Sequence, residues 1–371
     1  HHHHYQQAVV VDHLYKAAEL VQTGNSILAH EILARLNHHL SPVGRPFHRA
    51  AFHCKEALQQ LLRNGDAPHP PPPSPFGLVF KVGAYKLFSE ISPVVQFANF
   101  TANQAVLEAV DGFDAIHIVD FDIGYGVQWA SLMQEIGLRG GSSTPSVKIT
   151  AFISPGTHDQ LELGLIRENL IHFASEVNIP FEFQAIGIDS LGSSGPWLLP
   201  ESKAEDEGVA VNLPFGSLPS SMPSILSFLK RLSPRIVVSV ETGCDRTDLS
   251  FADHVVHVLQ SHSDLLESLD AVNLHMNNDA LQKIERFLLK PAIERAVAAR
   301  FRSPDKAQQH WKSLLLSCGF SPVMFSSLTE SQAECVVKRS PVRGFRVEKS
   351  QSSLLLCWQK KELLSVSAWR C

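Results

Sequence analysis

The chain has 371 residues, of which 44% are hydrophobic and 19% are charged, and its formal net charge is −5. This composition is typical of a globular protein and excludes a disordered or fibrous chain. A dedicated DNA-binding module usually carries excess positive charge, because neutralising phosphates supplies most of its affinity. Any contact of this chain with DNA must therefore come from a local basic patch.

The N-terminal segment begins with HHHHYQQ, residues 1–7, which we interpret as a tail or tag outside the fold. Apolar residues then repeat at helical spacing within 10–21, 28–40 and 47–62, and short turns separate these segments. They predict a leucine-rich α-helical cap over residues 8–64. The residues between 65 and 76 include a run of prolines, which predicts a linker.

Strands and helices alternate through most of the remaining chain, residues 77–371. Expected strands cover 115–119, 147–153, 181–186, 209–213 and 235–240. Expected helices cover 78–90, 93–110, 127–138, 160–177, 225–232, 251–269, 281–299 and 307–317. At the end of the chain, the expected strands cover 322–325, 345–348, 354–359 and 363–367. The alternation predicts an α/β protein with a Rossmann-like, methyltransferase-type, mostly parallel sheet and helices on both faces. We expect the C-terminal strands to form an antiparallel edge.

The segment IHIVDFDIGYGVQW, residues 116–129, has the order of a buried strand, a glycine turn and a helix start. In an open α/β sheet, ligands bind at the carboxyl ends of strands, close to helix N-termini. The candidate pocket residues at this corner are Asp120, Asp122, Gly124, Gly126 and Gln128.

The match of this corner to a cofactor fingerprint is incomplete. Trp129 occupies the position of the third glycine in GxGxxG, and the expected second strand ends without the carboxylate that would bind a ribose. A glycine turn is also needed for strand–helix packing alone. We therefore expect no cofactor and no enzyme activity, with a methyltransferase-like small-ligand binder as an alternative. His254 and His257 lie three residues apart without a third ligand nearby, so we expect no metal site.

Several motifs in order along the chain resemble those of the GRAS family of plant transcription regulators. Ile116-His117-Ile118-Val119-Asp120 resembles the VHIID signature, and the leucine-rich stretches 10–62 and 161–173 resemble the two leucine heptad regions. The other matching motifs are the PFYRE-like Pro180-Phe181-Glu182-Phe183, the Trp311/Gly319 and Trp358/Trp369 spacings, and the SAW ending Ser367-Ala368-Trp369. The segment 29–37, followed by Ser41-Pro42, is similar to the HAIRY MERISTEM branch in particular.

The resemblance implies a nuclear transcriptional regulator with a helical cap on a methyltransferase-like core. It implies homo- or heterodimers with GRAS-type proteins and binding to homeodomain or other transcription factors. For the HAIRY MERISTEM branch these partners are WUSCHEL-type homeodomain proteins, acting in meristem maintenance and plant development. It implies no established enzyme activity.

Two surfaces are candidates for these contacts. Apolar residues of the cap are candidates for partner binding, and core packing is the alternative explanation for them: Leu14, Leu28, Ile32, Leu36 and Leu40. Basic residues are candidates for DNA contact, and an ordinary solvated surface is the alternative. They are Lys338, Arg339, Arg343, Arg346 and Lys349, and separately Arg295, Arg300 and Arg302.

Overall fold

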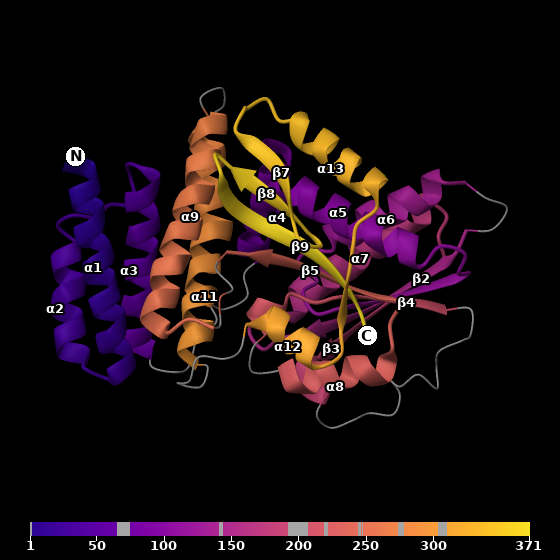
Figure 1. Cartoon of the computed structure of the whole chain (residues 1–371), viewed down its shortest axis with the longest axis horizontal. Helices are drawn as coiled ribbons and strands as arrows, with labels where there is room; N and C mark the ends of the chain where they lie inside the picture. The colour runs from indigo at the N-terminus through magenta and orange to yellow at the C-terminus, as the bar shows by residue number, and fades with distance from the viewer. Residues whose placement is uncertain are drawn as a thin grey trace.

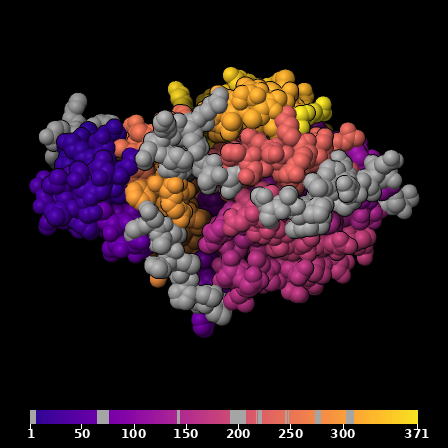
Figure 2. Space-filling model, turned by 90° about the horizontal axis from the view of Figure 1, so that it is seen from below, coloured from indigo at the N-terminus to yellow at the C-terminus, as the bar shows by residue number. Residues whose placement is uncertain are grey.

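The computed structural model describes residues 2–64, 75–140, 144–191, 207–218, 222–243, 246, 248–273, 278–302 and 310–371. A helical cap and an α/β core lie side by side along the long axis of the molecule (Figure 1). The N-terminal helices form one end of the molecule in the space-filling view as well (Figure 2). Within the described residues, no helix combines the length and the apolar character needed to cross a membrane.

Helices from distant parts of the chain build the cap. α1 (His2–Thr23), α2 (Ser26–Leu36) and α3 (Pro46–Asn64) share one apolar cluster with α9 (Phe251–Asn273) and α11 (Lys290–Arg302). The cap therefore extends beyond the N-terminal segment from which the sequence predicts it. The later helices supply the apolar surface that short amphipathic helices need for burial.

The N-terminal boundary differs from the prediction. The histidine- and glutamine-rich segment, expected to lie outside the fold, forms the first turns of α1, which begins at His2. The proline-rich segment 65–76 lies outside the described residues up to residue 74. α4 then begins at Pro75, where a proline is tolerated because the first helical N–H needs no partner within the helix.

A buried ion network connects the cap helices. Arg49 of α3 donates to Asp270 of α9 at 2.7 Å and to Glu285 at 2.7 and 3.0 Å. The second carboxylate oxygen of Glu285 lies 2.9 Å from Nε2 of His53. Burial opposes ionisation of Glu285, but the hydrogen bonds from His53 and Arg49 and their charge hold its pKa below the ordinary value. The network therefore joins α3, α9 and the helix that precedes α11.

The core contains one sheet with the strand order β3-β2-β1-β4-β5-β9-β8-β7, and β6 pairs with β9. The strands from β1 to β5 pair in parallel, whereas β9 is antiparallel to β5 and to β8. The strand bounds are β1 Ala115–Asp120, β2 Ser146–Ile153, β3 Phe181–Gly187, β4 Glu207–Asn212, β5 Ile236–Thr242, β6 Ser321–Val323, β7 Phe345–Ser350, β8 Ser353–Trp358 and β9 Lys361–Arg370. The predicted α/β fold with an antiparallel C-terminal edge is confirmed.

Helices cover both faces of the sheet. The cluster on one face involves α5, α6, α7 and α13, and the cluster on the other involves α8 and α12. α4 and α10 contact each other, and buried residues of both belong to the apolar cluster of the cap. The helix bounds are α4 Pro75–Ile91, α5 Pro93–Ala109, α6 Val127–Leu138, α7 Gln160–Glu176, α8 Met222–Leu232, α10 Asn278–Ile284, α12 Trp311–Ser317 and α13 Ser327–Lys338, with short 3-10 helices at Ile188–Leu191 and Phe215–Ser217.

Two helical segments differ from the sequence prediction. The helix expected over 281–299 is divided by a π-helical segment, Glu285–Leu289, before α11. Pro291 follows this segment and cannot donate to the preceding turn, which favours a local change in hydrogen bonding. α13 lies between the strands expected at 322–325 and 345–348, in a stretch for which we predicted no element. Its buried residues, Thr329, Ala333 and Val337, recur every four residues but are small or polar, so the helical pattern is weak.

Candidate functional site

The glycine corner links the carboxyl end of β1 to α6. Gly124 and Gly126 have φ values of +55° and +78°, in the left-handed region that favours glycine. A Cβ atom on Gly126 would lie 3.1 Å from Leu170 and 3.4 Å from Ile166, both on α7. A Cβ atom on Gly124 would meet nothing within 4 Å. The space above Gly126 is therefore filled by α7, whereas the space above Gly124 is open.

Asp120, the first acidic residue of the corner, is 1% exposed and serves as a structural brace. Its carboxylate accepts hydrogen bonds from the Trp129 indole N–H at 2.6 Å and from the Asn212 amide and the Asp122 backbone N–H, both at 2.8 Å. Burial raises the pKa of Asp120 to about 6, although these hydrogen bonds favour the charged form. The carboxylate thus ties together β1, β4 and α6 and has no exposed oxygen surface to offer a ligand.

Sequence reasoning missed two of these partners. Trp129 occupies the place of a glycine in the cofactor fingerprint, and it donates to the carboxylate there. Asn212 is the residue opposite Asp120 in the parallel pairing of β1 with β4. Asp120 and Asn212 each end a strand, which is a signal that could have suggested a hydrogen bond between them. Whether the two strands are neighbours, however, depends on the strand order of the sheet.

The end of β2, where a ribose-binding acid would lie, is occupied by an aromatic cluster. Phe152 is buried and stacks on Phe121 with ring centroids 4.9 Å apart. The ring of Phe228 from α8 meets Phe152 edge-on at 5.6 Å. These contacts fill the underside of the corner with apolar side chains.

The open side of the corner faces polar groups from other elements. Asp122 is exposed, accepts a hydrogen bond from the backbone N–H of Gly124 and lies within electrostatic range of Arg295 on α11. His158, which precedes α7, donates from Nε2 to the Gly124 carbonyl at 2.8 Å. Burial and the nearby charge of Glu162 raise the pKa of Tyr125 to about 12, so its hydroxyl stays neutral.

Gln128, the last candidate pocket residue, lies in the first turn of α6. Its backbone carbonyl accepts a hydrogen bond from Asn103 at 3.0 Å, and its side-chain amide nitrogen is buried without a partner among the described residues. The corner therefore holds α5 and α6 together at the carboxyl end of β1. In the part of the chain that the structure describes, no three metal-ligating side chains are grouped to hold a metal.

The leucine candidates for partner binding are corrected in part. Leu14, Leu36 and Leu40 are buried in the cap cluster, so they cannot form a surface in this conformation. Ile32 is half-buried against the same cluster, and Leu28 is 51% exposed. Leu14 and Leu36 belong to the buried faces that α1 and α2 need, so core packing explains these leucines without a partner.

The C-terminal basic candidates are all exposed but do not form one patch. Successive side chains of a strand point to opposite faces, so Arg346 and Lys349 of β7 lie on different sides of the sheet. Lys349 forms an ion pair with Glu330 of α13 at 3.1 Å and therefore faces this helix. Lys338 is the last residue of α13, and Arg339 follows it.

Arg343, before the glycine turn at Gly344, and Arg346 belong to a second group. A concave surface of about 310 Å³ is lined by Gly344, Phe345, Arg346, Gln359 and Lys360.

The other set of basic candidates, Arg295, Arg300 and Arg302, is also divided. Arg300 is buried and donates to the Leu249 carbonyl, which corrects its assignment as a DNA contact, whereas Arg295 and Arg302 are exposed.

The fold and the corner define the class of the protein as a Rossmann-like α/β scaffold with a helical cap, in which the usual cofactor corner is braced by side chains. The model of the GRAS domain family matches residues 10–370, and the chain belongs to this family. It is 54% identical over 363 residues to Scarecrow-like protein 6 of Arabidopsis thaliana, covering 98% of this chain and 63% of the relative.

Further relatives support the same assignment. Scarecrow-like protein 27 of Arabidopsis thaliana is 48% identical, covering 98% of this chain and 59% of the relative. The chain thus spans about three fifths of the length of these relatives. The crystal structure of SCL7 in Oryza sativa is similar with a TM-score of 0.71 and 28% identity, covering 97% of this chain and 99% of that one. The similarity confirms the fold along nearly the whole chain.

Proposed function

We propose that this chain is the GRAS domain of a plant transcription regulator that acts in the nucleus through contacts with other proteins, and that it has no enzyme activity. Membership of the GRAS family supports the regulatory role. The proposed lack of enzyme activity rests on Asp120, because its carboxylate is buried and already accepts three hydrogen bonds.

The finer assignment is to the HAIRY MERISTEM branch, with WUSCHEL-type homeodomain proteins as partners in meristem maintenance. The segment 29–37 with the following Ser41-Pro42 supports this branch. Dimers with GRAS-type proteins are part of the same proposal. The exposed apolar residues outside the cap core provide surfaces for such contacts.

Two measurements test the proposal. A plant-cell reporter controlled by a WUSCHEL-type protein should change its output when this chain is co-expressed, and the two proteins should co-precipitate from nuclear extracts. Absence of both effects would contradict the proposed role. Titration calorimetry with S-adenosylmethionine should give no binding heat at millimolar ligand, and saturable heat would favour the small-ligand alternative.

Direct DNA binding is a second candidate, favoured by the basic concave surface beside Gly344. Arg346 and Lys360 line this surface, and exposed Arg343 directly precedes the turn. Phosphate contacts of this kind would make affinity fall steeply with salt. A mobility shift that is unchanged by Arg343→Glu with Arg346→Glu would exclude this surface.

A further inference from the structure

α4 presents large apolar side chains to solvent. Phe76, Val79 and Phe80 are 76%, 67% and 48% exposed. Together with Gly83 they follow the spacing of one helical face, because residues three and four apart lie side by side on a helix. Exposed apolar patches on soluble proteins often mark sites of interaction with other molecules.

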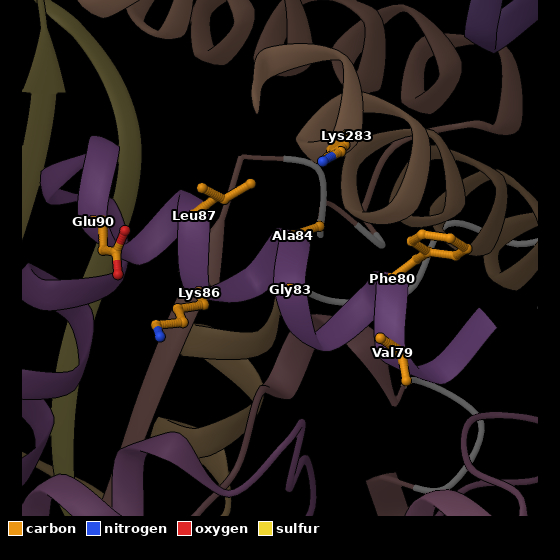
Figure 3. Close-up of a pocket in the computed structure, with 8 residues that line it drawn as sticks. All are labelled: Val79, Phe80, Gly83, Ala84, Lys86, Leu87, Glu90 and Lys283. Carbon is orange, nitrogen blue, oxygen red and sulfur yellow. The ribbon is translucent and has the colours of Figure 1, made fainter. Parts of the chain in front are cut away.

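The same face forms one side of a groove of about 420 Å³ (Figure 3). Gly83 and the buried Ala84 lie at its centre, and a Cβ atom on Gly83 would meet nothing within 4 Å. The ring of Phe80 is held by stacking on Phe287, with centroids 5.3 Å apart. The groove thus combines small residues, which allow close approach, with an aromatic side chain in a fixed position.

Basic side chains outnumber acidic ones along this apolar groove. Lys86 of α4 and Lys283 of α10 line it, and Arg286 lies over the ring of Phe287 at 5.3 Å. Lys86 forms no ion pair with the described residues, and Lys283 has only an exposed contact of 3.5 Å with Asp279 on its own helix. Glu90 is the acidic residue among those lining the groove. A ligand with carboxylates beside an apolar face therefore complements the groove.

The elements around the groove indicate the shape of this ligand. α4 and α10 are neighbouring helices, and a third helix can place its side chains between theirs. A second copy of this chain would bring the same excess of positive charge to the contact, which like-charge repulsion disfavours. An acidic amphipathic helix from another protein avoids this repulsion.

We propose that the groove between α4 and α10 binds an acidic amphipathic helix of a partner protein. Apolar residues of the partner at positions i, i+4 and i+7 enter between Phe80 and Leu87, and its carboxylates contact Lys86 and Lys283. This inference rests on the proposed function, because it identifies a surface through which a regulator without enzyme activity could recruit other proteins.

The test uses the full chain and two labelled helical peptides that differ only in their charged residues. Both carry leucines at i, i+4, i+7 and i+11, and their flanking positions are glutamate in one peptide and lysine in the other. Fluorescence polarisation should show the glutamate peptide binding at least about tenfold more tightly than the lysine peptide. Lys86→Glu with Lys283→Glu should reverse this preference, because the charges then match the lysine peptide.

Filling the groove provides a second variant with a matched control. Gly83→Leu should weaken binding of the glutamate peptide at least about tenfold. Gly164 on α7 is also an exposed helical glycine whose Cβ would meet nothing within 4 Å, so Gly164→Leu should leave binding unchanged. Circular dichroism should show the same helix content for both variants, and if Gly83→Leu unfolds the chain, the lysine variants decide.

Three outcomes would overturn the inference: equal affinities for the two peptides, no saturable binding at about 100 μM, or equal effects of the two glycine variants. Loss of a dimer in the Gly83→Leu chain during sedimentation would instead identify a second copy as the occupant. The reporter assay separates this inference from the proposed function. A reporter response that survives Gly83→Leu supports the function and rejects the groove, and loss of response only in this variant supports both.

Discussion

The ion network of the cap gives the sharpest prediction of stability. Replacing Glu285 by glutamine keeps the shape of the side chain but removes the charge that faces Arg49 and His53. Removing one partner of a buried ion pair costs about 3–5 kcal/mol, because the other charge stays buried. Asp270 remains bonded to Arg49, and glutamine can still accept one hydrogen bond. We therefore expect the free energy of unfolding to fall by about 2 kcal/mol.

Urea unfolding followed by circular dichroism measures this change, since the network lies within the helical cap. The matched control is Asp12→Asn, which breaks the exposed pair of Asp12 and Lys16 on α1. Such a surface pair contributes at most about 0.5 kcal/mol. Equal unfolding midpoints for the Glu285 and Asp12 variants would refute the reasoning.

The pH dependence checks the electrostatic origin of the effect. The pKa of Glu285 is lowered in the folded chain from an ordinary value of 4.5, so its contribution is present above that pH. The contribution is lost as the pH falls through the lowered folded pKa, because the carboxylate is then protonated in both states. The stability difference between the natural chain and Glu285→Gln should shrink below about pH 4.5. A difference that stays constant down to pH 3 would indicate a packing effect.

Three further changes test the corner and the sheet. Gly126→Ala should lower the free energy of unfolding by about 1–2 kcal/mol because of the left-handed backbone, and by about 1–3 kcal/mol more because of the contact with Leu170. Gly124→Ala should lower it only by the first amount, since its Cβ meets nothing. Equal changes for the two variants in urea unfolding would contradict the packing argument. Trp129→Phe should cost about 1–3 kcal/mol by removing one donor to Asp120, and an unchanged unfolding midpoint would show that the bond is unimportant. Deleting residues 367–371 removes a buried part of β9 and should lower the melting temperature by about 5 °C or more in calorimetry, and an unchanged melting temperature would show that this end is not part of the core.

The core of the fold could be predicted because its patterns are local. The expected helix over 127–138 matches α6 at both ends, and the expected strands overlap β1 to β5 within two residues at each end. Their apolar runs and glycine turns depend on neighbours in the chain. The composition of the cap could not be predicted in the same way, since α9 and α11 join it from more than 180 residues away.

The location of the glycine corner in the fold could be predicted, but its contacts could not. Position and backbone conformation of Gly124 and Gly126 follow from the strand–turn–helix order. The role of Asp120 depends on Asn212, which lies on a strand that becomes its neighbour only through the order of the sheet. The exposed face of α4 was also missed, because an apolar helix in a sequence indicates burial and does not show which side is left uncovered.

The position of β9 in the sheet has a consequence for synthesis. This strand is the last of the domain, yet it lies inside the sheet, between β5 and β8, and also pairs with β6. While the chain emerges from the ribosome, one edge of β5 remains unpaired until β9 has left the exit tunnel. The nascent chain therefore leaves one side of the apolar strand β5, Ile236–Thr242, unpaired while residues 243–360, which precede β9, are synthesised. We expect folding in the cell to depend on chaperones that cover this edge until the final strand arrives.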